Sequence, residues 1–218
     1  MYEKIIEEIK NTATQLIAVS KTKPNDAILE LYHKGQRAFG ENYVQELVEK
    51  HAALPADIQW HFIGHLQTNK VKYIAPFVHT IHAVDSVKLL EEIDKQAVKH
   101  NRTIKCLLQF HIADEDSKFG FDTEGGEIIE EEFLKQLKNA VICGVMGMAT
   151  FTEDKIQVRQ EFKKLKQIFD SLKNTYFKDN ETFKHISMGM SDDYKIAVEE
   201  GSTMVRIGSL LFGKRATN

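Results

Sequence analysis

The sequence contains few of the residues that define disordered, collagen-like or disulfide-rich chains. Among its 218 residues there are 3 prolines, 12 glycines and 2 cysteines. This composition, with 42% hydrophobic residues, excludes collagen-like, linker-rich and disordered chains. Cys106 and Cys143 lie far apart inside apolar segments and form no CxxC pair, which argues against a disulfide framework or a zinc site. We therefore expect a compact protein in a reducing compartment.

The sequence also lacks a long apolar run and a strong excess of either charge. The longest mostly apolar stretch, 140–151, is shorter than the roughly 20 residues that span a bilayer. The N-terminus MYEKIIEEIK mixes charges with isoleucine, so it does not resemble a signal peptide. With 29 basic and 32 acidic residues the net charge is −3, which disfavours a broad basic face for nucleic acid. These features predict a cytoplasmic protein that binds neither membranes nor nucleic acid.

Eight short apolar runs recur along the chain, with amphipathic segments between them. Consecutive apolar and β-branched positions in these runs are typical of parallel strands that are covered on both faces. The clearest helix lies between the sixth and seventh runs, where apolar residues repeat at alternating spacings of four and three. Its face comprises Val158, Phe162, Leu165, Phe169 and Leu172. The runs are residues 16–21, 38–42, 60–64, 80–85, 105–112, 141–148, 185–189 and 204–209.

This alternation predicts the fold class. Eight strand and helix pairs, with one extra helix before the first strand, favour a single α/β domain over residues 1–218, a (β/α)₈ barrel of the TIM type. A doubly wound open sheet is the alternative. That fold usually carries a glycine-rich turn after its first strand, whereas VSKTKP at 19–24 has no glycine. No composition shift, linker or low-complexity tract marks a second domain.

Residues typical of helix ends support the same division. Pro24 precedes one helical segment, Asn42 can cap the segment that begins at Tyr43, and Ser86 precedes another. Ser191 is expected to open a helix whose stop signal is Gly201.

Lys21 stands at the end of the first predicted strand, where barrel proteins place functional side chains. It lies four positions after Ile17 and two after Val19, so it would share their face of the strand, and we expect it to point into the barrel. Loss of hydration there lowers the pKa of an amine, and such an amine can form a Schiff base. An ordinary solvated lysine is the alternative, and Lys23 has the same parity, which leaves the choice between the two lysines open.

Arg206 interrupts the last predicted strand, MVRIGS. Alternation places Val205 and Ile207 toward the helices and Arg206 inside the barrel. A buried guanidinium needs an acceptor, which is either a carboxylate in a structural ion pair or a ligand atom.

Two serine- and glycine-containing turns follow the last two strands, SMGMS at 187–191 and IGS at 207–209. Backbone N–H groups at helix N-termini, together with serine hydroxyls, can bind a phosphate, and these loops commonly do so in barrels. Each turn alone could simply be a helix cap, so the prediction of a phosphate site rests on their joint position.

Other residues carry weaker signals. His61 and His65 are four apart, but Gly64 ends a strand between them, so we assign no metal site. His111, Asp114 and Asp116 could line the mouth of the barrel, and Phe119 and Phe121 could pack over its rim. The carboxylates at 127–132 are best explained as the solvated face of a helix.

Several ordered motifs resemble the pyridoxal phosphate homeostasis protein family, which is related to the N-terminal barrel of alanine racemase. The resemblance runs nearly end to end, with one departure in GMATF at 147–151, where many relatives carry a proline-containing turn. It implies a fold type III barrel that binds pyridoxal 5′-phosphate (PLP). The motifs are AVSKTKP, FGENYVQE, WHFIGHLQTNK, SKFGF, GMSDD and GSTMVRIGSLLFGKR.

The resemblance also implies residue roles. Lys21 would carry PLP as an aldimine, Arg206 would face the pyridine nitrogen, and Asn42 would lie beside the ring. The residues implied around the phosphate are Ser187, Gly189, Ser191, Gly208 and Ser209.

These roles favour a cytoplasmic carrier or regulator over an enzyme. An arginine leaves the pyridine nitrogen unprotonated and the ring a weak electron sink, whereas a carboxylate would keep it protonated. The sequence ends nine residues after Ser209, so we expect no second β domain to close the site. The alternatives are a PLP-dependent amino-acid racemase and an aldolase-like barrel that uses Lys21 on a sugar phosphate. PLP-dependent apo-enzymes are possible recipients of the cofactor.

Overall fold

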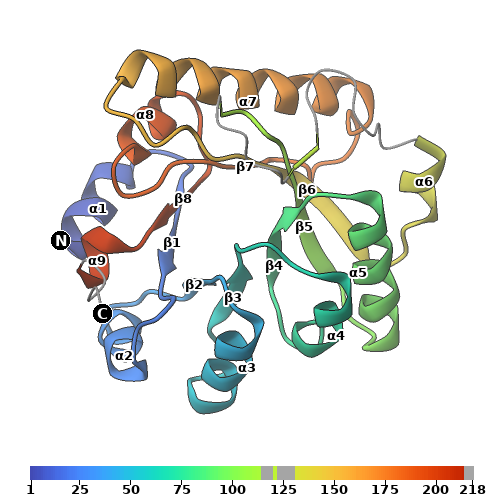
Figure 1. Cartoon of the computed structure of the whole chain (residues 1–218), viewed down its shortest axis with the longest axis horizontal. Coiled ribbons are helices and arrows are strands. Elements are labelled where there is room, and N and C mark those ends of the chain that lie inside the picture. Colours follow the sequence, from blue (N-terminus) through green and yellow to red (C-terminus); the bar gives the residue numbers. More distant parts are fainter. Residues whose placement is uncertain (114–119, 122–130, 214–218) are drawn as a thin grey trace.

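The computed structural model describes residues 1–113, 120–121 and 131–213. Its eight strands are all parallel and form a closed barrel in chain order, with the last strand paired to the first (Figure 1). The strands are β1 (Gln15–Val19), β2 (Ala38–Glu41), β3 (Gln59–Phe62), β4 (Thr80–Val84), β5 (Ile104–Gln109), β6 (Ala140–Met146), β7 (His185–Ser187) and β8 (Met204–Ile207).

The barrel predicted from the sequence is confirmed, and the open sheet is wrong. Closure comes from the pairing of β1 with β8, in which Ile17 lies opposite Arg206. Each strand ends before its predicted run does, as β1 ends at Val19 rather than at Lys21. The last residues of each run therefore belong to the loops at the C-terminal face of the barrel, where a functional site is expected.

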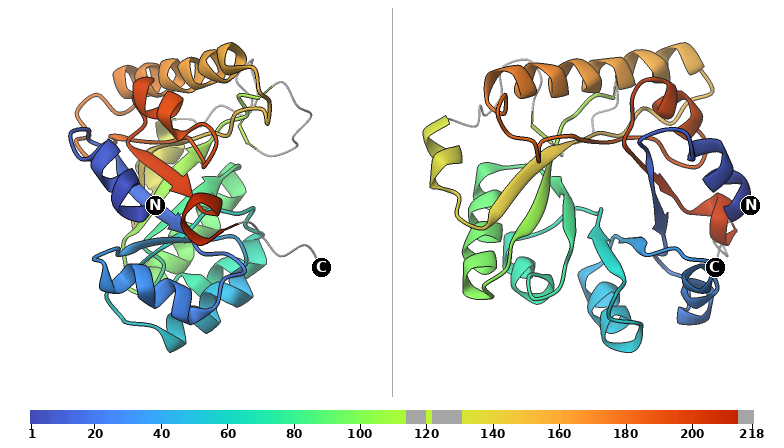
Figure 2. Two further views of the ribbon diagram at one scale, coloured as in Figure 1. Left: turned by 90° about the vertical axis from the view of Figure 1, so that its left-hand side faces the viewer. Right: turned by 180° about the vertical axis from the view of Figure 1, so that it is seen from behind.

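Helices surround the barrel, and α1 is the extra N-terminal helix that the sequence predicts. Ile5 and Ile9 of α1 pack against Leu16 of β1 and Val205 of β8, so this helix covers the seam at which the barrel closes. The long helix α7 lies along one side of the barrel, over β6 and β7 (Figures 1 and 2). The helices are α1 (Tyr2–Ile9), α2 (Asn25–His33), α3 (Val44–Ala53), the short 3₁₀ helix η1 (Thr68–Lys70), α4 (Val71–Ile74), α5 (Val87–Lys99), α6 (Glu131–Gln136), α7 (Lys155–Thr175), α8 (Tyr194–Glu199) and α9 (Ser209–Phe212).

Strand alternation divides the core into two layers. Outward side chains meet the helices in the larger layer, which includes Trp60 and Phe162. Both cysteines are buried and free, as expected, with Cys106 in the outer layer and Cys143 in the inner one. The apolar side chains of the inner layer are Ile17, Ala38, Ala83, Leu107, Cys143, Met146 and Met204.

The expected helix ends are partly correct. The Ser86 hydroxyl caps α5 by accepting from the N–H of Leu89, and Gly201 follows α8 with a φ of +90°. The Asn42 cap is wrong, because α3 begins at Val44 and no side chain caps it. The start at Ser191 is also wrong, because residues 191–193 form a turn and α8 begins at Tyr194.

No helix in the described ranges is both long and apolar enough to cross a membrane.

Candidate functional site

A cavity of about 320 Å³ opens at the C-terminal face of the barrel. Loops that follow β1, β2, β3, β6, β7 and β8 contribute to it. Six of the eight predicted site residues line it, although they are up to 188 positions apart in the sequence (209 − 21). These six are Lys21, Asn42, Ser191, Arg206, Gly208 and Ser209. The other lining residues are Val19, Lys23, Ile63, Met148, Phe151, Met190, Asp192 and Gly213.

Ser187 and Gly189 are the two predicted residues that do not line this cavity. Ser187 is fully buried behind it, in contact with Arg206. Gly189 has a φ of +95°, and a Cβ atom there would lie 2.5 Å from Cβ of Ala197. Its carbonyl accepts from the N–H of Arg206 at 2.9 Å. Gly189 thus lets the loop after β7 pack closely on α8 and bond the strand that carries Arg206.

Arg206 lies inside the barrel, as its parity predicts, and is 4% exposed. Its guanidinium donates to Ser187 Oγ at 2.6 Å and to the carbonyl of Gly147 at 3.0 Å. Burial lowers the pKa of Arg206 to about 10, so it remains a cation at neutral pH. No carboxylate in the described ranges forms an ion pair with it, so the structural ion pair considered from the sequence is absent there. Each terminal nitrogen retains a second N–H group, which can donate a hydrogen bond to a ligand in the cavity.

Two buried histidines extend this contact away from the cavity. His82 Nδ1 lies 2.9 Å from Ser187 Oγ, and His82 Nε2 lies 2.8 Å from His61 Nδ1. Burial, the main cause, and nearby cationic groups lower the pKa of both histidines well below the usual value. Arg206, Ser187, His82 and His61 therefore form a hydrogen-bonded chain of one cation and neutral groups. Sequence reasoning missed this chain, although each histidine, like Arg206, interrupts an otherwise apolar strand.

The two lysines left open by the sequence differ in their surroundings. Lys21 follows β1, is half-buried and lines the cavity. Lys23 also lines the cavity, but its ammonium donates to the carbonyls of Phe212 and Gly213 at 3.0 and 3.2 Å. Lys23 is therefore engaged in holding the end of α9.

Asn42 faces the cavity instead of capping α3. Its side-chain oxygen is buried and has no hydrogen-bond partner within the described ranges. Gly64 packs directly on this residue, since a Cβ atom at 64 would lie 2.5 Å from the Asn42 carbonyl oxygen. The close backbone approach at Gly64 therefore holds Asn42 in place, with an unused acceptor that suits a ligand donor.

The turn after β7, where the sequence predicts a helix start at Ser191, contains the carboxylate of Asp193. Asp193 Oδ1 accepts from the backbone N–H of Met190 at 2.5 Å, so the turn satisfies its own donor before α8 begins. The backbone of Asp193 is non-helical, with φ −131° and ψ 0°, so α8 begins only at Tyr194. Burial, the main cause, raises the pKa of Asp193, while Arg206 acts in the opposite direction.

A second cavity of about 510 Å³ adjoins the first and shares Asn42 with it. It lies between the first turn of α3 and the segment of η1 and α4. Two of the motifs that carry the family resemblance supply much of its lining, which comprises Asn42, Tyr43, Val44, Gln45, Val48, Phe62, His65, Gln67, Lys70 and Tyr73.

The weaker candidates that the structure describes are not among the residues lining the first cavity. His61 is buried inside the barrel, whereas His65 is exposed and lies 3.1 Å from Asp85, so the two histidines do not share a site. No group of three potential metal ligands occurs in the described ranges. Phe121 is buried against Phe110, consistent with packing. His111 is not among the residues that line the first cavity. Asp114, Asp116, Phe119 and 127–130 lie outside the described residues.

Comparisons with known proteins agree with this geometry. Residues 2–216 match the family model for the alanine racemase N-terminal domain. The chain is 42% identical over 202 residues to the pyridoxal phosphate homeostasis protein of Aquifex aeolicus, covering 92% of this chain and 87% of that protein.

Solved structures extend the comparison. PipY of Synechococcus elongatus matches at 34% identity without PLP, with a TM-score of 0.86 and coverage of 97% of this chain and 99% of that chain. Its structure with PLP bound matches at 33% identity with a TM-score of 0.80 and the same coverage. Alanine racemase from Bartonella henselae shares the fold, at 16% identity and a TM-score of 0.72, over 99% of this chain and 59% of the racemase chain. The chain thus has the barrel of the alanine racemase N-terminal domain family and belongs, within it, to the pyridoxal phosphate homeostasis proteins.

Proposed function

We propose that this protein binds PLP in the cavity at the C-terminal face of the barrel and serves PLP homeostasis as a carrier or regulator. The observation that carries the proposal is that six residues, chosen from the sequence for this cofactor, line one cavity. The PLP-bound relative of the same fold supports the choice of cofactor.

The residues of the cavity fit the chemical groups of PLP. Arg206 offers N–H donors that no carboxylate in the described ranges uses, and Asn42 offers an unused oxygen. Ser191 and Ser209 bring hydroxyls to the loops after β7 and β8, and Gly208 provides the close turn before α9. The fit requires the phosphate to lie away from Asp192, because two anions repel each other.

Lys21 is the proposed attachment residue. PLP supplies an aldehyde that condenses with amines and a pyridine ring that accepts electrons. The neutral Lys21 amine attacks the aldehyde carbon, a C=N bond forms, and the aldehyde oxygen leaves as water with the two amine protons. The choice of Lys21 over Lys23 follows the family resemblance, in which the lysine of the AVSKTKP motif directly after the first strand carries the cofactor.

Arg206 is proposed to face the pyridine nitrogen. It can donate a hydrogen bond there but gives up no proton near neutral pH, because its pKa stays near 10. Ser187, which lies behind the cavity, is proposed to act by orienting the guanidinium, and Gly189 by shaping the loop beside it. These two residues then support the site without contacting the phosphate.

The same residues favour a carrier over a racemase. The titratable side chains among the described residues that line the cavity are Lys21, Lys23, Asp192 and Arg206. Proton exchange on a bound amino acid needs a well-placed second acid or base, and a protonated ring nitrogen makes the ring a stronger electron sink. Arg206 facing that nitrogen would leave the sink weak. We infer that the protein has no substantial turnover, acts in the cytoplasm where its free cysteines stay reduced, and hands PLP to apo-enzymes.

An absorption spectrum with borohydride reduction and peptide mapping tests the proposal. The purified protein mixed with PLP is expected to show a visible band that reduction abolishes, with the label on Lys21. Lys21→Ala should lose the band, and the matched control Lys23→Ala should retain it. A label on Lys23, or a colourless wild-type protein, would overturn the assignment.

A further inference from the structure

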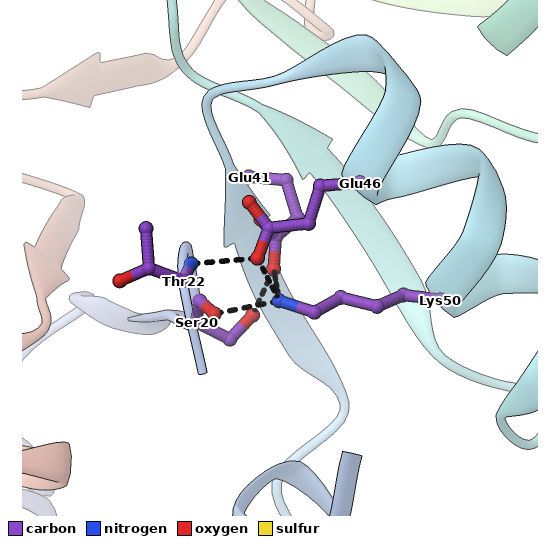
Figure 3. A network of polar contacts seen from close by, with 5 residues as sticks. All are labelled: Ser20, Thr22, Glu41, Glu46 and Lys50. Carbon is purple, nitrogen blue, oxygen red and sulfur yellow. Dashed lines mark hydrogen bonds and ion pairs between the residues drawn. The ribbon is translucent and has the colours of Figure 1, made fainter. Parts of the chain in front are cut away.

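A buried cluster of charged side chains lies directly behind the loop that carries Lys21 (Figure 3). Lys50 of α3 donates from Nζ to Oε1 of Glu41 at 2.8 Å, to Oε1 of Glu46 at 2.7 Å and to the carbonyl of Ser20 at 2.7 Å. The Lys50 side chain is only 6% exposed, and Glu41 is fully buried. An ammonium has three N–H donors, and the three contacts of Lys50 Nζ provide an acceptor for each of them.

This cluster is bonded to the residues on both sides of Lys21. On one side, the Ser20 hydroxyl donates to Oε1 of Glu41 at 2.6 Å, and the Ser20 carbonyl accepts from Lys50. On the other side, the backbone N–H of Thr22 donates to Oε1 of Glu46 at 2.6 Å. The backbone at Lys21 is therefore held between two residues that the cluster fixes.

Thr22 has an unfavourable backbone conformation that these contacts maintain. Its φ is +63°, in the left-handed region that β-branched residues rarely adopt. Such strain persists only where the surroundings enforce it, and it concentrates at functional sites. The Thr22 N–H bond to Glu46 supplies a direct restraint at the strained residue.

Stability alone is a poor explanation for the cluster. A buried ion pair can often be replaced by apolar residues without loss of stability, because removing charges from water is costly. The cluster also leaves Oε2 of Glu41 buried without a hydrogen-bond partner in the described ranges. What the cluster does supply is three hydrogen bonds to Ser20 and Thr22, the residues on either side of Lys21.

We propose that Lys50, Glu41 and Glu46 are positioning residues that hold the backbone of residues 20–22 so that the Lys21 amine points at the PLP aldehyde. This inference rests on the proposed attachment at Lys21. Holding the amine beside the aldehyde raises its effective concentration and speeds attachment. Weakening the cluster should therefore slow attachment while the contacts to the phosphate and ring persist.

Glu46→Ala is the decisive variant, because Glu46 is the most exposed member of the cluster, at 22%, and its loss removes the bond to Thr22. The rate of attachment is measured at saturating PLP from the growth of the visible band, and borohydride mapping verifies Lys21 as the site. Total bound PLP is measured separately by ultrafiltration. Loss of a restraint of this kind is expected to slow attachment about fivefold or more. Total binding should change much less, and Lys50→Met should show a larger effect.

Two further variants separate positioning from general destabilisation. Thr22→Gly in the Glu46→Ala background should restore part of the lost rate, because glycine adopts positive φ without strain. Asp94→Ala is the matched control, since the Asp94 carboxylate accepts from the N–H groups of Lys138, Asn139 and Ala140 at the start of β6, at the other end of the barrel. It should lower stability and leave the attachment rate unchanged.

The possible failures are distinguishable. Absence of attachment at Lys21 in the wild-type protein would overturn the proposed function. Normal wild-type attachment with an unchanged rate in Glu46→Ala would overturn only the positioning role. An equal slowing in Asp94→Ala, or no recovery with Thr22→Gly, would show that the cluster acts through stability alone.

Discussion

The Arg206 guanidinium donates a 2.6 Å hydrogen bond to the hydroxyl of Ser187, which lies on the neighbouring strand and is fully buried. The same oxygen lies 2.9 Å from Nδ1 of His82. Ser187 therefore connects the cation that lines the cavity to a neutral histidine inside the barrel. This contact fixes the direction in which Arg206 presents its remaining donors.

Ser187→Ala is expected to reduce both stability and PLP affinity. The change leaves one N–H of a buried cation without its acceptor, which costs about 1.5–3 kcal/mol of unfolding free energy. It also frees the guanidinium to rotate away from the ligand. Urea unfolding and a spectral titration with PLP measure the two effects. Ser202→Ala is the control, because the buried Ser202 hydroxyl bonds only backbone carbonyls, and its loss should spare PLP affinity. Unchanged affinity in Ser187→Ala would contradict the orienting role.

Pyridoxal without its phosphate is expected to bind at least about tenfold more weakly than PLP, because charge-assisted hydrogen bonds are lost together. The double variant with Ser191→Ala and Ser209→Ala should reduce the difference in affinity between PLP and pyridoxal. Ser86→Ala, which removes the cap of α5, is the control and should leave the difference in affinity unchanged. Competition titrations with the two vitamers provide the measurement. Equal affinities of the wild-type protein for PLP and pyridoxal would contradict the proposed phosphate-binding site.

The protein loaded with PLP is expected to show no substantial racemase, decarboxylase or transaminase turnover on common amino acids. In the proposed binding mode Arg206 would leave the ring nitrogen unprotonated, and Asp192 and Lys23 are the other titratable candidates for a second acid or base among the described lining residues. Proton NMR in deuterated water detects exchange at the α-carbon of alanine and serine. Rapid exchange that disappears in Lys21→Ala would favour the enzyme alternative.

Stability is expected to fall as the pH drops below about 6.5. His82 is neutral in the folded protein because burial, the main cause, lowers its pKa well below the usual value. The unfolded chain binds a proton there first, so unfolding becomes more favourable by about 1.4 kcal/mol per pH unit for each such histidine. This loss continues until the pH reaches the lower pKa of the folded state.

His82→Gln should make the unfolding free energy less dependent on pH. Between pH 6 and pH 5 the variant should take up about one proton fewer on unfolding than the wild-type protein. Urea unfolding at each pH gives the slope, which is the readout even if the variant is less stable at pH 7. A slope equal to that of the wild-type protein would show that His82 is protonated in the folded state.

The strands and most helices could be predicted because their signals are local. Both faces of a parallel strand are covered, so its sequence is a continuous apolar run, and an amphipathic helix shows its period directly. Helix starts were less predictable. Asn42 and Ser191 have the right residue types for caps, but the close packing of Gly64 on Asn42 and the non-helical backbone of Asp193 place the starts of α3 and α8 further along the chain.

Strand alternation alone predicts that Arg206 faces the barrel interior, beside Ile17, whereas Lys21 follows the end of β1 and reaches the cavity from a loop. What these residues contact depends on the tertiary structure. Ser187 and His82 are 105 positions apart, and Lys50 reaches Ser20 across 30, so no local pattern relates them. Strand period specifies the face of a residue, whereas barrel closure and register specify its neighbours, and the hydrogen bonds to Arg206 and around Lys21 depend on those neighbours.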